Sequence, residues 1–295
     1  MLKGVAAGFL AYGLFSASDA STKALGGTLS VFEILFFLTL ASFSTFAFAK
    51  PKDEAWPDMW RINNPRLVLI RNASGIVGSF FAVYSFTTLP LPEAYSLLFL
   101  MPAFVTIFSI PILGEEVGWR RWLAVIVGFG GVLLVVRPGF RELHLGHLTA
   151  IVGAALGAVS LITLRMIGRS EKRITMLASL YVMALIADGA LMIFNFRVPG
   201  WHEVAIFTLG GFLGGIGQIA MLTATRYAPS NRVAPAQYSQ MLWAILYGAL
   251  FFHNFPDPIA FVGIALVVAS GLFTFVREEQ LYGWSRRTFL LRTRQ

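Results

Sequence analysis

The chain has 295 residues, of which 57% are hydrophobic and 13% are charged, and its formal net charge is +8. A soluble domain carries about 25% charged residues, so this composition excludes an ordinary soluble protein and indicates a lipid environment. The chain has no cysteine, which excludes a disulfide framework, a thiolate metal site and a cysteine nucleophile.

Apolar segments recur along the whole chain, separated by breaks rich in glycine and proline, such as Pro138-Gly139 and Pro199-Gly200. A helix needs roughly 20 mainly apolar residues to cross a bilayer. The first segment follows Lys3 as a signal peptide would, but so many spans come after it that we interpret it as the first helix. The ten predicted spans are residues 4–22, 30–49, 67–88, 92–113, 119–136, 147–166, 174–195, 203–225, 231–251 and 258–276.

Basic residues are distributed unevenly between alternate loops. Cytoplasmic loops of membrane proteins are enriched in Lys and Arg. With a cytoplasmic N-terminus, 19 of the 23 basic residues fall inside, and the four that fall outside are Lys23, Arg137, Arg141 and Arg197. This asymmetry favours ten helices with both termini in the cytoplasm. The basic tail, residues 278–295, is expected to lie on an anionic membrane surface, and a nucleic-acid partner is not expected.

The two halves of the chain carry similar residues at nearly constant spacing. At an offset of 139 residues, Gly75, Gly78 and Pro90 match Gly214, Gly217 and Pro229, and further pairs such as Met101/Met241 and Gly131/Gly271 match at 140. Five helices per half is an odd number, so the second copy must be inverted. The sequence therefore predicts an all-α integral membrane protein of two inverted five-helix repeats, residues 1–140 and 141–277.

These motifs resemble the EamA-type branch of the drug/metabolite transporter superfamily over essentially the whole chain. The resemblance is carried by the glycine-bearing third and eighth spans, the connection Leu89-Pro90-Leu91-Pro92-Glu93-Ala94, the helix end Pro102…Gly114-Glu115-Glu116 and the pair Gly128…Gly131. The ninth span departs from the family pattern, because it ends in His253-Asn254 where the family often has glycine–glutamate.

The resemblance implies a secondary transporter of the bacterial inner membrane that works by alternating access, without a cofactor. Within the family the chain most resembles bacterial aromatic amino acid exporters. The resemblance thus implies a small-molecule substrate, an amino acid, and outward transport. The third, fourth, eighth and ninth spans, which carry glycine and proline, are expected to bend as the cavity opens to each side.

Polar and aromatic residues within the spans are candidates for substrate binding, because polar side chains in a membrane tend to face a wet cavity. Amides offer donors and acceptors without a net charge, and aromatic rings can bracket an apolar substrate. The candidates are Tyr12, Ser16, Ser79, Tyr95, Phe99, Gln218, Met221, Gln237, Gln240 and Trp243. Two other aromatic residues, Tyr238 and Tyr247, lie near them in the ninth span.

Simpler structural roles compete with these assignments. Small residues in membrane helices commonly serve close helix packing. Tryptophans such as Trp122 fit the interfacial aromatic belt, and Tyr95 and Tyr238 could belong to it too. Trp243 lies deeper in its span and is the better cavity candidate.

Two carboxylates lie within predicted spans, Asp19 near the outer end of the first and Asp188 near the middle of the seventh. Either is a candidate for proton coupling or for contact with a substrate ammonium group. The competing interpretations are a hydrated helix-end acid for Asp19 and a structural hydrogen bond for Asp188.

Signatures of catalysis, of ATP binding and of metal binding are missing from the sequence. There is no glycine-rich phosphate loop that ends in Lys-Ser/Thr. His144 and His147 are three residues apart but have no cysteine or acidic companions, so neither a metal nor a catalytic residue is expected. The alternatives are a proton-coupled drug or cation exporter, a carrier of nucleotide sugars or phosphate esters, which the lack of midplane cations disfavours, and a membrane-embedded enzyme. The oligomeric state is left open.

Overall fold

The computed structural model describes residues 2–50, 53–114, 116–137, 142–168, 170–227 and 234–273. Throughout these residues the chain is helical, apart from turns, loops and one isolated bridge between Gly26 and Leu29. The first half contains α1 (Leu2–Leu25), α2 (Val31–Phe43), α3 (Phe46–Ala49), η1 (Trp56–Trp60), α4 (Pro65–Thr88), α5 (Leu91–Leu98), α6 (Met101–Leu113) and α7 (Trp119–Val136). The second half contains α8 (Leu145–Ile167), α9 (Arg173–Met192), η2 (Ile193–Asn195), α10 (Trp201–Tyr227), η3 (Ala234–Tyr238), α12 (Ser239–Phe252) and the last helix, Pro258–Phe273.

Six stretches among the described residues are helical, long enough and apolar enough to cross a membrane. They are Pro65–Thr88, Leu91–Leu113, Trp119–Val136, Leu145–Ile167, Arg173–Asn195 and Trp201–Ala224. Two shorter apolar helices, Val31–Phe43 and Pro258–Phe273, accompany them. Large apolar side chains such as Trp201, which is 90% exposed, cover the outer surface. This arrangement is typical of a multi-pass membrane protein, whose lipid-facing surface is apolar.

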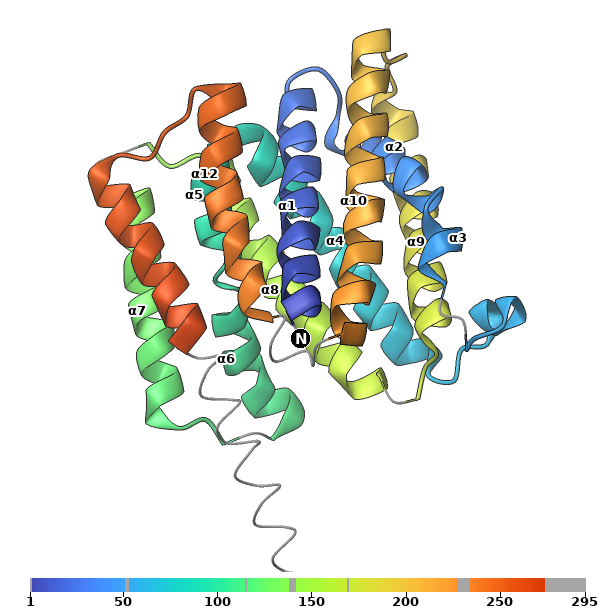
Figure 1. Ribbon diagram of the computed structural model, residues 1–295, viewed down its shortest axis with the longest axis horizontal. Helices are drawn as coiled ribbons and strands as arrows, with labels where there is room; N and C mark the ends of the chain where they lie inside the picture. The colour runs from blue at the N-terminus through green and yellow to red at the C-terminus, as the bar shows by residue number, and fades with distance from the viewer. Residues whose placement is uncertain are drawn as a thin grey trace, which may run out of the picture.

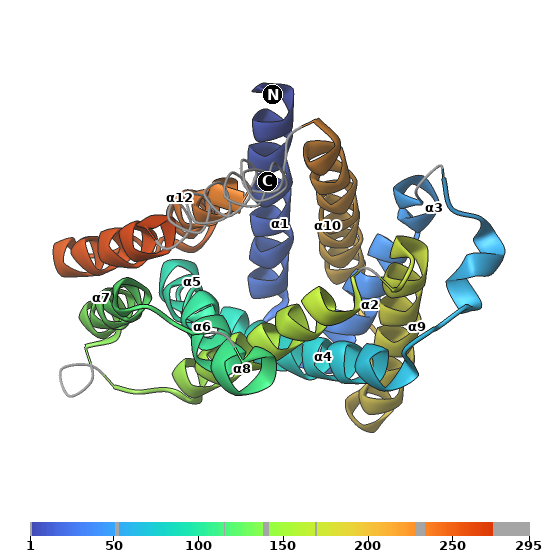
Figure 2. The same ribbon diagram turned by 90° about the horizontal axis from the view of Figure 1, so that it is seen from below.

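Two helix pairs form the centre of the bundle, α1 with α10 and α4 with α8 (Figures 1 and 2). Glycine permits both close approaches. A Cβ built on Gly75 of α4 would lie 3.2 Å from Ser160 Oγ of α8, and one on Gly214 of α10 would lie 3.2 Å from Ser18 Oγ of α1. The same contact thus occurs once in each pair, and we call α1–α10 and α4–α8 the glycine-packed pairs.

The remaining helices flank these pairs on two sides. Figure 2 shows α2, α3 and α9 beyond α10, and α5, α6, α7 and α12 on the opposite side of α1. The N-terminus lies at one end of α1, and the chain turns at Gly26 beyond the other (Figure 1). We refer to these two ends of the bundle as the N-terminal end and the Gly26 end.

Three predicted spans are interrupted in the structure. The second ends its first helix at Phe43 and resumes at Phe46, the fourth breaks at Phe99–Leu100, and the ninth changes from 3₁₀ to α-helix after Tyr238. The third and eighth spans, α4 and α10, are continuous helices of 24 and 27 residues. The glycines of these two spans lie against neighbouring helices, and the expectation that the spans bend during transport stays a prediction.

At the N-terminal end, the segment from Glu54 to Asn64 is tied to the start of α9. Both oxygens of Glu54 accept from backbone N–H groups, those of Arg173 and Ile174, at 3.1 and 2.7 Å, and Lys172 Nζ lies 2.7 Å from Asp58 Oδ2. The hydrogen bond from Lys172, together with one from the Ala55 backbone, lowers the pKa of the Asp58 carboxyl. These contacts join a loop of the first half to the second half.

Candidate functional site

The breaks in the fourth and ninth spans meet inside the bundle. Pro102 stands at the start of α6 and has no N–H, so the carbonyl of Leu98 loses its helical partner and α5 ends. Phe99, at this break, packs its ring edge-on against Tyr238, at the other break, with ring centroids 5.6 Å apart. Discontinuous helices of this kind often build the substrate sites of transporters.

A chain of hydrogen bonds lies beside this junction. Tyr95 of α5 donates its phenol O–H to the Asp19 carboxylate of α1. A phenol has only one proton to donate, and Tyr95 donates it to Asp19. In the hydrogen bond between Ser16 and Tyr95, whose oxygens are 3.2 Å apart, the Ser16 hydroxyl is therefore the donor. Tyr95 and Ser16 are 3% and 1% exposed. The structure therefore brings Ser16, Asp19 and Tyr95 together and places Tyr95 outside any interfacial belt.

Aromatic rings surround this hydrogen-bonded group. Phe86 and Phe99 lie 5.2 and 6.0 Å from the Tyr95 ring, measured between centroids. Trp243 of α12 lies beside α1, where its ring would be 3.1 Å from a Cβ on Gly13, one turn before Ser16, and it stacks on Tyr247 at 5.9 Å between ring centroids. We call Ser16, Asp19, Tyr95, Phe99 and Trp243 the central cluster.

The amide groups of the three glutamine candidates have no hydrogen-bond partner among the described residues. Gln218 of α10, Gln237 of η3 and Gln240 of α12 are half-buried, and their side chains form no hydrogen bond with the part of the chain that the structure describes. A half-buried amide without a protein partner can offer its donors and acceptors to a ligand.

Three predicted binding residues are engaged elsewhere. Ser79 donates to the Ile76 carbonyl of its own helix at 2.7 Å. Tyr12 packs edge-on against Phe15, and Met221 packs against Ala224. These contacts are with residues other than Tyr95 and Asp19, so we do not include these three residues in the hydrogen-bonded group.

The two membrane carboxylates have different surroundings. Asp19 shares the hydrogen bond with Tyr95, whereas Asp188 lies on α9, which packs against α2 and α4. Asp188 is 1% exposed, and its Oδ1 oxygen has no hydrogen-bond partner among the described residues. Only Asp19 therefore belongs to the central cluster.

Lys23 is a residue of this region that sequence reasoning recognised only as a basic residue outside the membrane. Its Nζ lies 2.6 Å from the Leu89 carbonyl and 3.5 Å from that of Phe86, and 5.3 Å from the centroid of the Phe252 ring. Pro90 was the one sequence feature that pointed to this contact, because a proline has no N–H and leaves the Phe86 carbonyl without a helical partner. Nothing in the sequence places a lysine next to that carbonyl.

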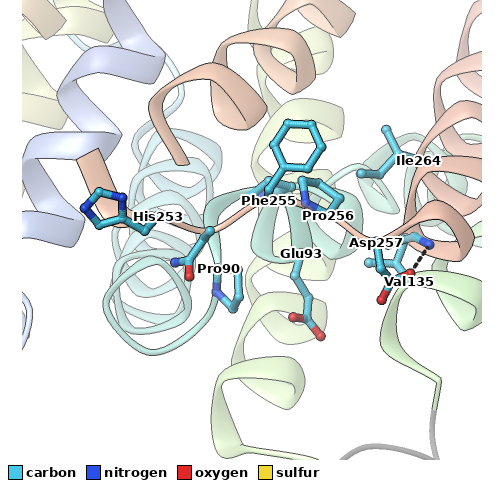
Figure 3. A pocket seen from close by; sticks show the side chains of 11 residues that line it. Pro90, Glu93, Val135, His253, Phe255, Pro256, Asp257 and Ile264 are labelled. Atoms are coloured by element: carbon cyan, nitrogen blue, oxygen red, sulfur yellow. Dashed lines mark hydrogen bonds between the residues drawn. The ribbon is translucent and has the colours of Figure 1, made fainter. Parts of the chain in front are cut away.

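A pocket of about 230 Å³ opens at the Gly26 end, between the start of α5, the end of α7 and the segment His253–Asp257 (Figure 3). Asp257 in this segment forms an ion pair with Arg137. Glu93, also in the wall, bonds through Oε1 with Nε2 of His147 at 2.9 Å. In the tautomer in which His147 Nδ1 accepts from the backbone N–H of His144, at 2.9 Å, Nε2–H donates a hydrogen bond to Glu93.

Comparisons with known proteins agree with this architecture. The S-adenosylmethionine uptake transporter of Rickettsia felis is 24% identical over 272 residues, which are 90% of each chain. The pseudopaline exporter of Pseudomonas aeruginosa is 25% identical over 90% of this chain and 94% of its own. The riboflavin transporter of Rhizobium johnstonii is 28% identical over 66% of this chain and 65% of its own.

One solved crystal structure has the same fold, with a TM-score of 0.64 at 16% identity, over 94% of this chain and 98% of that chain. The model of the EamA-like transporter family matches twice, at residues 2–137 and 144–276. These two matches cover nearly the whole sequence. The protein is a member of the EamA-like transporter family.

Proposed function

We propose that ten helices cross the membrane as two inverted repeats, with both termini in the cytoplasm of a bacterial cell. The two family matches and the repeated glycine–serine contact between helix pairs support the division into repeats. The distribution of basic residues supports the orientation, in which the Gly26 end faces outward.

Engineered cysteines test this topology directly, since the chain has none of its own. Cysteines at the exposed residues Thr28 and Gly200 should react with an impermeant reagent only from outside, and one at Asp53 only from inside. Gly26 is unsuitable, because a Cβ there would lie 2.6 Å from Thr87 Cβ. Mixed labelling would contradict the ten-helix arrangement.

We propose further that the protein is a secondary transporter of small neutral or zwitterionic metabolites and exports amino acids, aromatic ones included. The observation that carries this proposal is the hydrogen-bonded chain Ser16–Tyr95–Asp19, buried at the point where two broken helices meet. Asp19 offers a carboxylate to a substrate ammonium group, and the glutamines offer neutral donors to a substrate carboxylate. Phe99 and Trp243 provide aromatic faces for a large side chain.

The relatives support a substrate with a flat ring system. S-adenosylmethionine and riboflavin, named for two of them, both contain fused heteroaromatic rings. One relative is an uptake transporter and another an exporter, so outward transport by this chain is a proposal that the family alone does not supply.

A proton-coupled exporter of organic cations is the second candidate function. The position of Asp19 favours it, because a carboxylate among aromatic rings is suited to bind either a proton or a lipophilic cation. A cation would then replace the amino acid in the same cluster.

Counterflow in proteoliposomes decides between these substrates. A panel of aromatic and aliphatic amino acids should exchange against labelled substrate, whereas cationic drugs should exchange poorly. We expect Gln237→Ala, Gln240→Ala and Trp243→Ala each to weaken apparent affinity by about five- to 150-fold, the effect of losing roughly 1–3 kcal/mol. Trp243→Ala should weaken the binding of bulky substrates most.

Trp122→Ala is the control, because Trp122 is 41% exposed on the lipid-facing surface. Its counterflow should equal that of the wild type. If all three variants of the ninth span also transport normally, substrate does not bind at this face and the proposed site is wrong.

A further inference from the structure

We infer that Lys23 is a positioning residue that holds the Gly26 end of the substrate site closed by binding two carbonyls that have no helical partner. This inference uses the proposed function only in calling the central cluster a substrate site. The contact itself joins α1, the corner between α4 and α5, and the end of α12.

The two carbonyls are free for a reason that lies in the sequence. In a continuous helix the Phe86 carbonyl would accept from the N–H of residue 90, but proline has none. The Leu89 carbonyl would accept from Glu93, but the Glu93 N–H bonds to the Pro90 carbonyl at 3.0 Å. Both carbonyls therefore stand at the C-terminal end of α4, where unpaired carbonyls and the helix dipole attract a cation.

Lys23, which belongs to α1, provides the cation that binds these carbonyls. Its ammonium group is 2.6 Å from the Leu89 carbonyl, and the Phe252 ring of α12 lies on it as a cation–π partner. Leu89 itself is 1% exposed. A single side chain thus binds three elements that would have to separate for the Gly26 end to open.

Lys23 lies between the central cluster and the pocket at the Gly26 end. Lys23 follows Asp19 by one turn of α1, and Phe86 packs against Tyr95. On the other side, Pro90 and His253 line the pocket in Figure 3, and they directly follow Leu89 and Phe252 in the chain. The contacts of Lys23 therefore lie between that pocket and the hydrogen-bonded chain of Tyr95.

The second half of the chain supplies a natural comparison. Ser18 and Ser160 make the same contact with Gly214 and Gly75. Five residues after each serine stand Lys23 and Arg165, so the two cations occupy equivalent positions at opposite ends of the bundle. Arg165 is exposed and makes no side-chain hydrogen bond or ion pair with the described residues, whereas Lys23 is bound. Of these two equivalent cations, only Lys23 binds carbonyls of a neighbouring helix among the described residues.

A single cysteine at position 20 reports this closure. Ala20 lies on α1 between Asp19 and Lys23, is 7% exposed, and packs in the same apolar cluster as Phe86 and Leu89. An impermeant maleimide is applied from each side of the membrane in turn, with the substrate-free protein. We expect slow labelling of Ala20→Cys, labelling at least about tenfold faster with Lys23→Met added, and slow labelling again with Lys23→Arg.

Two controls make the result specific. Arg165→Met should leave the labelling rate from the Gly26 side unchanged, and a cysteine at the exposed residue Thr28 should react equally fast in every background. Size-exclusion profiles verify that each variant is folded. If Lys23→Met labels no faster than its parent from either side, Lys23 does not close this end and the inference is wrong.

The result is independent of the substrate, because labelling needs no transport. Faster labelling in Lys23→Met without counterflow of any amino acid would overturn the proposed function and leave the closure by Lys23 standing. Counterflow with unchanged labelling would overturn the closure alone.

Discussion

The glycine-packed pairs and the broken spans use different residue types to opposite effect. In α1–α10 and α4–α8, glycines let two continuous helices touch along their length. In α5–α6 and η3–α12, the helix is interrupted near a proline and aromatic side chains fill the gap. We infer that each glycine-packed pair moves as one body, and that the broken spans absorb the motion between the two pairs.

The largest expected effect comes from filling the glycine contacts. A Cβ on Gly78 would lie 3.2 Å from Leu156 Cβ, and one on Gly217 would lie 2.8 Å from the Phe15 ring. Gly78→Leu and Gly217→Leu should each destabilise the protein by about 1–3 kcal/mol, because the helices must move apart. Thermal unfolding in detergent measures this loss.

Gly130 provides the matched control for these substitutions. It is also a helical glycine, but a Cβ there would meet no atom within 4 Å. Gly130→Leu should leave the unfolding temperature nearly unchanged. Equal losses in all three variants would mean that helix packing at Gly78 and Gly217 is not special.

The second effect concerns the hydrogen-bonded chain beside the broken spans. Tyr95→Phe removes the hydroxyl that binds both Ser16 and Asp19 and leaves a half-buried carboxylate without its donor. We expect apparent affinity in counterflow to fall by about five- to 150-fold. Tyr181→Phe removes a comparable bond, to Ser42 at 2.9 Å between α2 and α9, far from the cluster. Transport by that variant should be normal, and an equal loss would assign Tyr95 a structural role only.

The third effect separates the two membrane carboxylates. If Asp19 carries the coupled proton, Asp19→Asn should abolish accumulation driven by a pH gradient and spare counterflow, because exchange needs no net proton movement; loss of counterflow as well would instead assign Asp19 to the substrate ammonium group. Asp188→Asn should preserve both activities, since Asp188 lies outside the central cluster. If accumulation by the wild type does not depend on a pH gradient, the transporter is not proton-coupled. If Asp188→Asn loses more gradient-driven accumulation than Asp19→Asn, the coupling residue is Asp188 of α9.

The smallest effect concerns the loop at the N-terminal end. The pKa of Asp58 is lowered in the folded protein by Lys172 and the Ala55 N–H. Its stabilising contribution is therefore complete above the ordinary aspartate pKa of about 3.9 and is lost as the pH falls towards the lower folded-state pKa. Asp58→Asn should reduce the unfolding temperature slightly at pH 6 and flatten its decline below about pH 4. An unchanged acid profile would show that this ion pair adds no stability.

Much of the fold follows from local sequence. Apolar runs placed the helices within a few residues, because the length of a membrane span is set by the bilayer. The breaks were harder to predict: Pro102 and Pro235 mark those of the fourth and ninth spans, the break between Phe43 and Phe46 has no proline, and Pro111 lies inside α6 without ending it. Whether a proline interrupts a helix depends on what else satisfies the freed carbonyl, and that information is tertiary.

Part of the candidate site could also be predicted. Ser16, Tyr95 and Phe99 were selected as polar or aromatic residues within spans, and Asp19 as an acid within a span, but their mutual contact was not foreseen. Lys23 was missed for the same reason, since its partners are carbonyls of a helix more than 60 residues away. Sequence patterns identify groups that need partners, and only the packing of α1 against α4 and α5 shows which groups meet.

Disulfide cross-links within the glycine-packed pairs test the central claim most directly. Cβ atoms at 75 and 160 would be 3.9 Å apart and those at 18 and 214 would be 3.7 Å apart, both suited to a disulfide. The paired variants Gly75→Cys/Ser160→Cys and Ser18→Cys/Gly214→Cys are oxidised, and counterflow is compared before and after reduction of the same sample. If each pair moves as one body, the oxidised proteins will transport within about twofold of the reduced ones. Transport that stops on oxidation and returns on reduction would show that these helices separate during the cycle, contrary to this account.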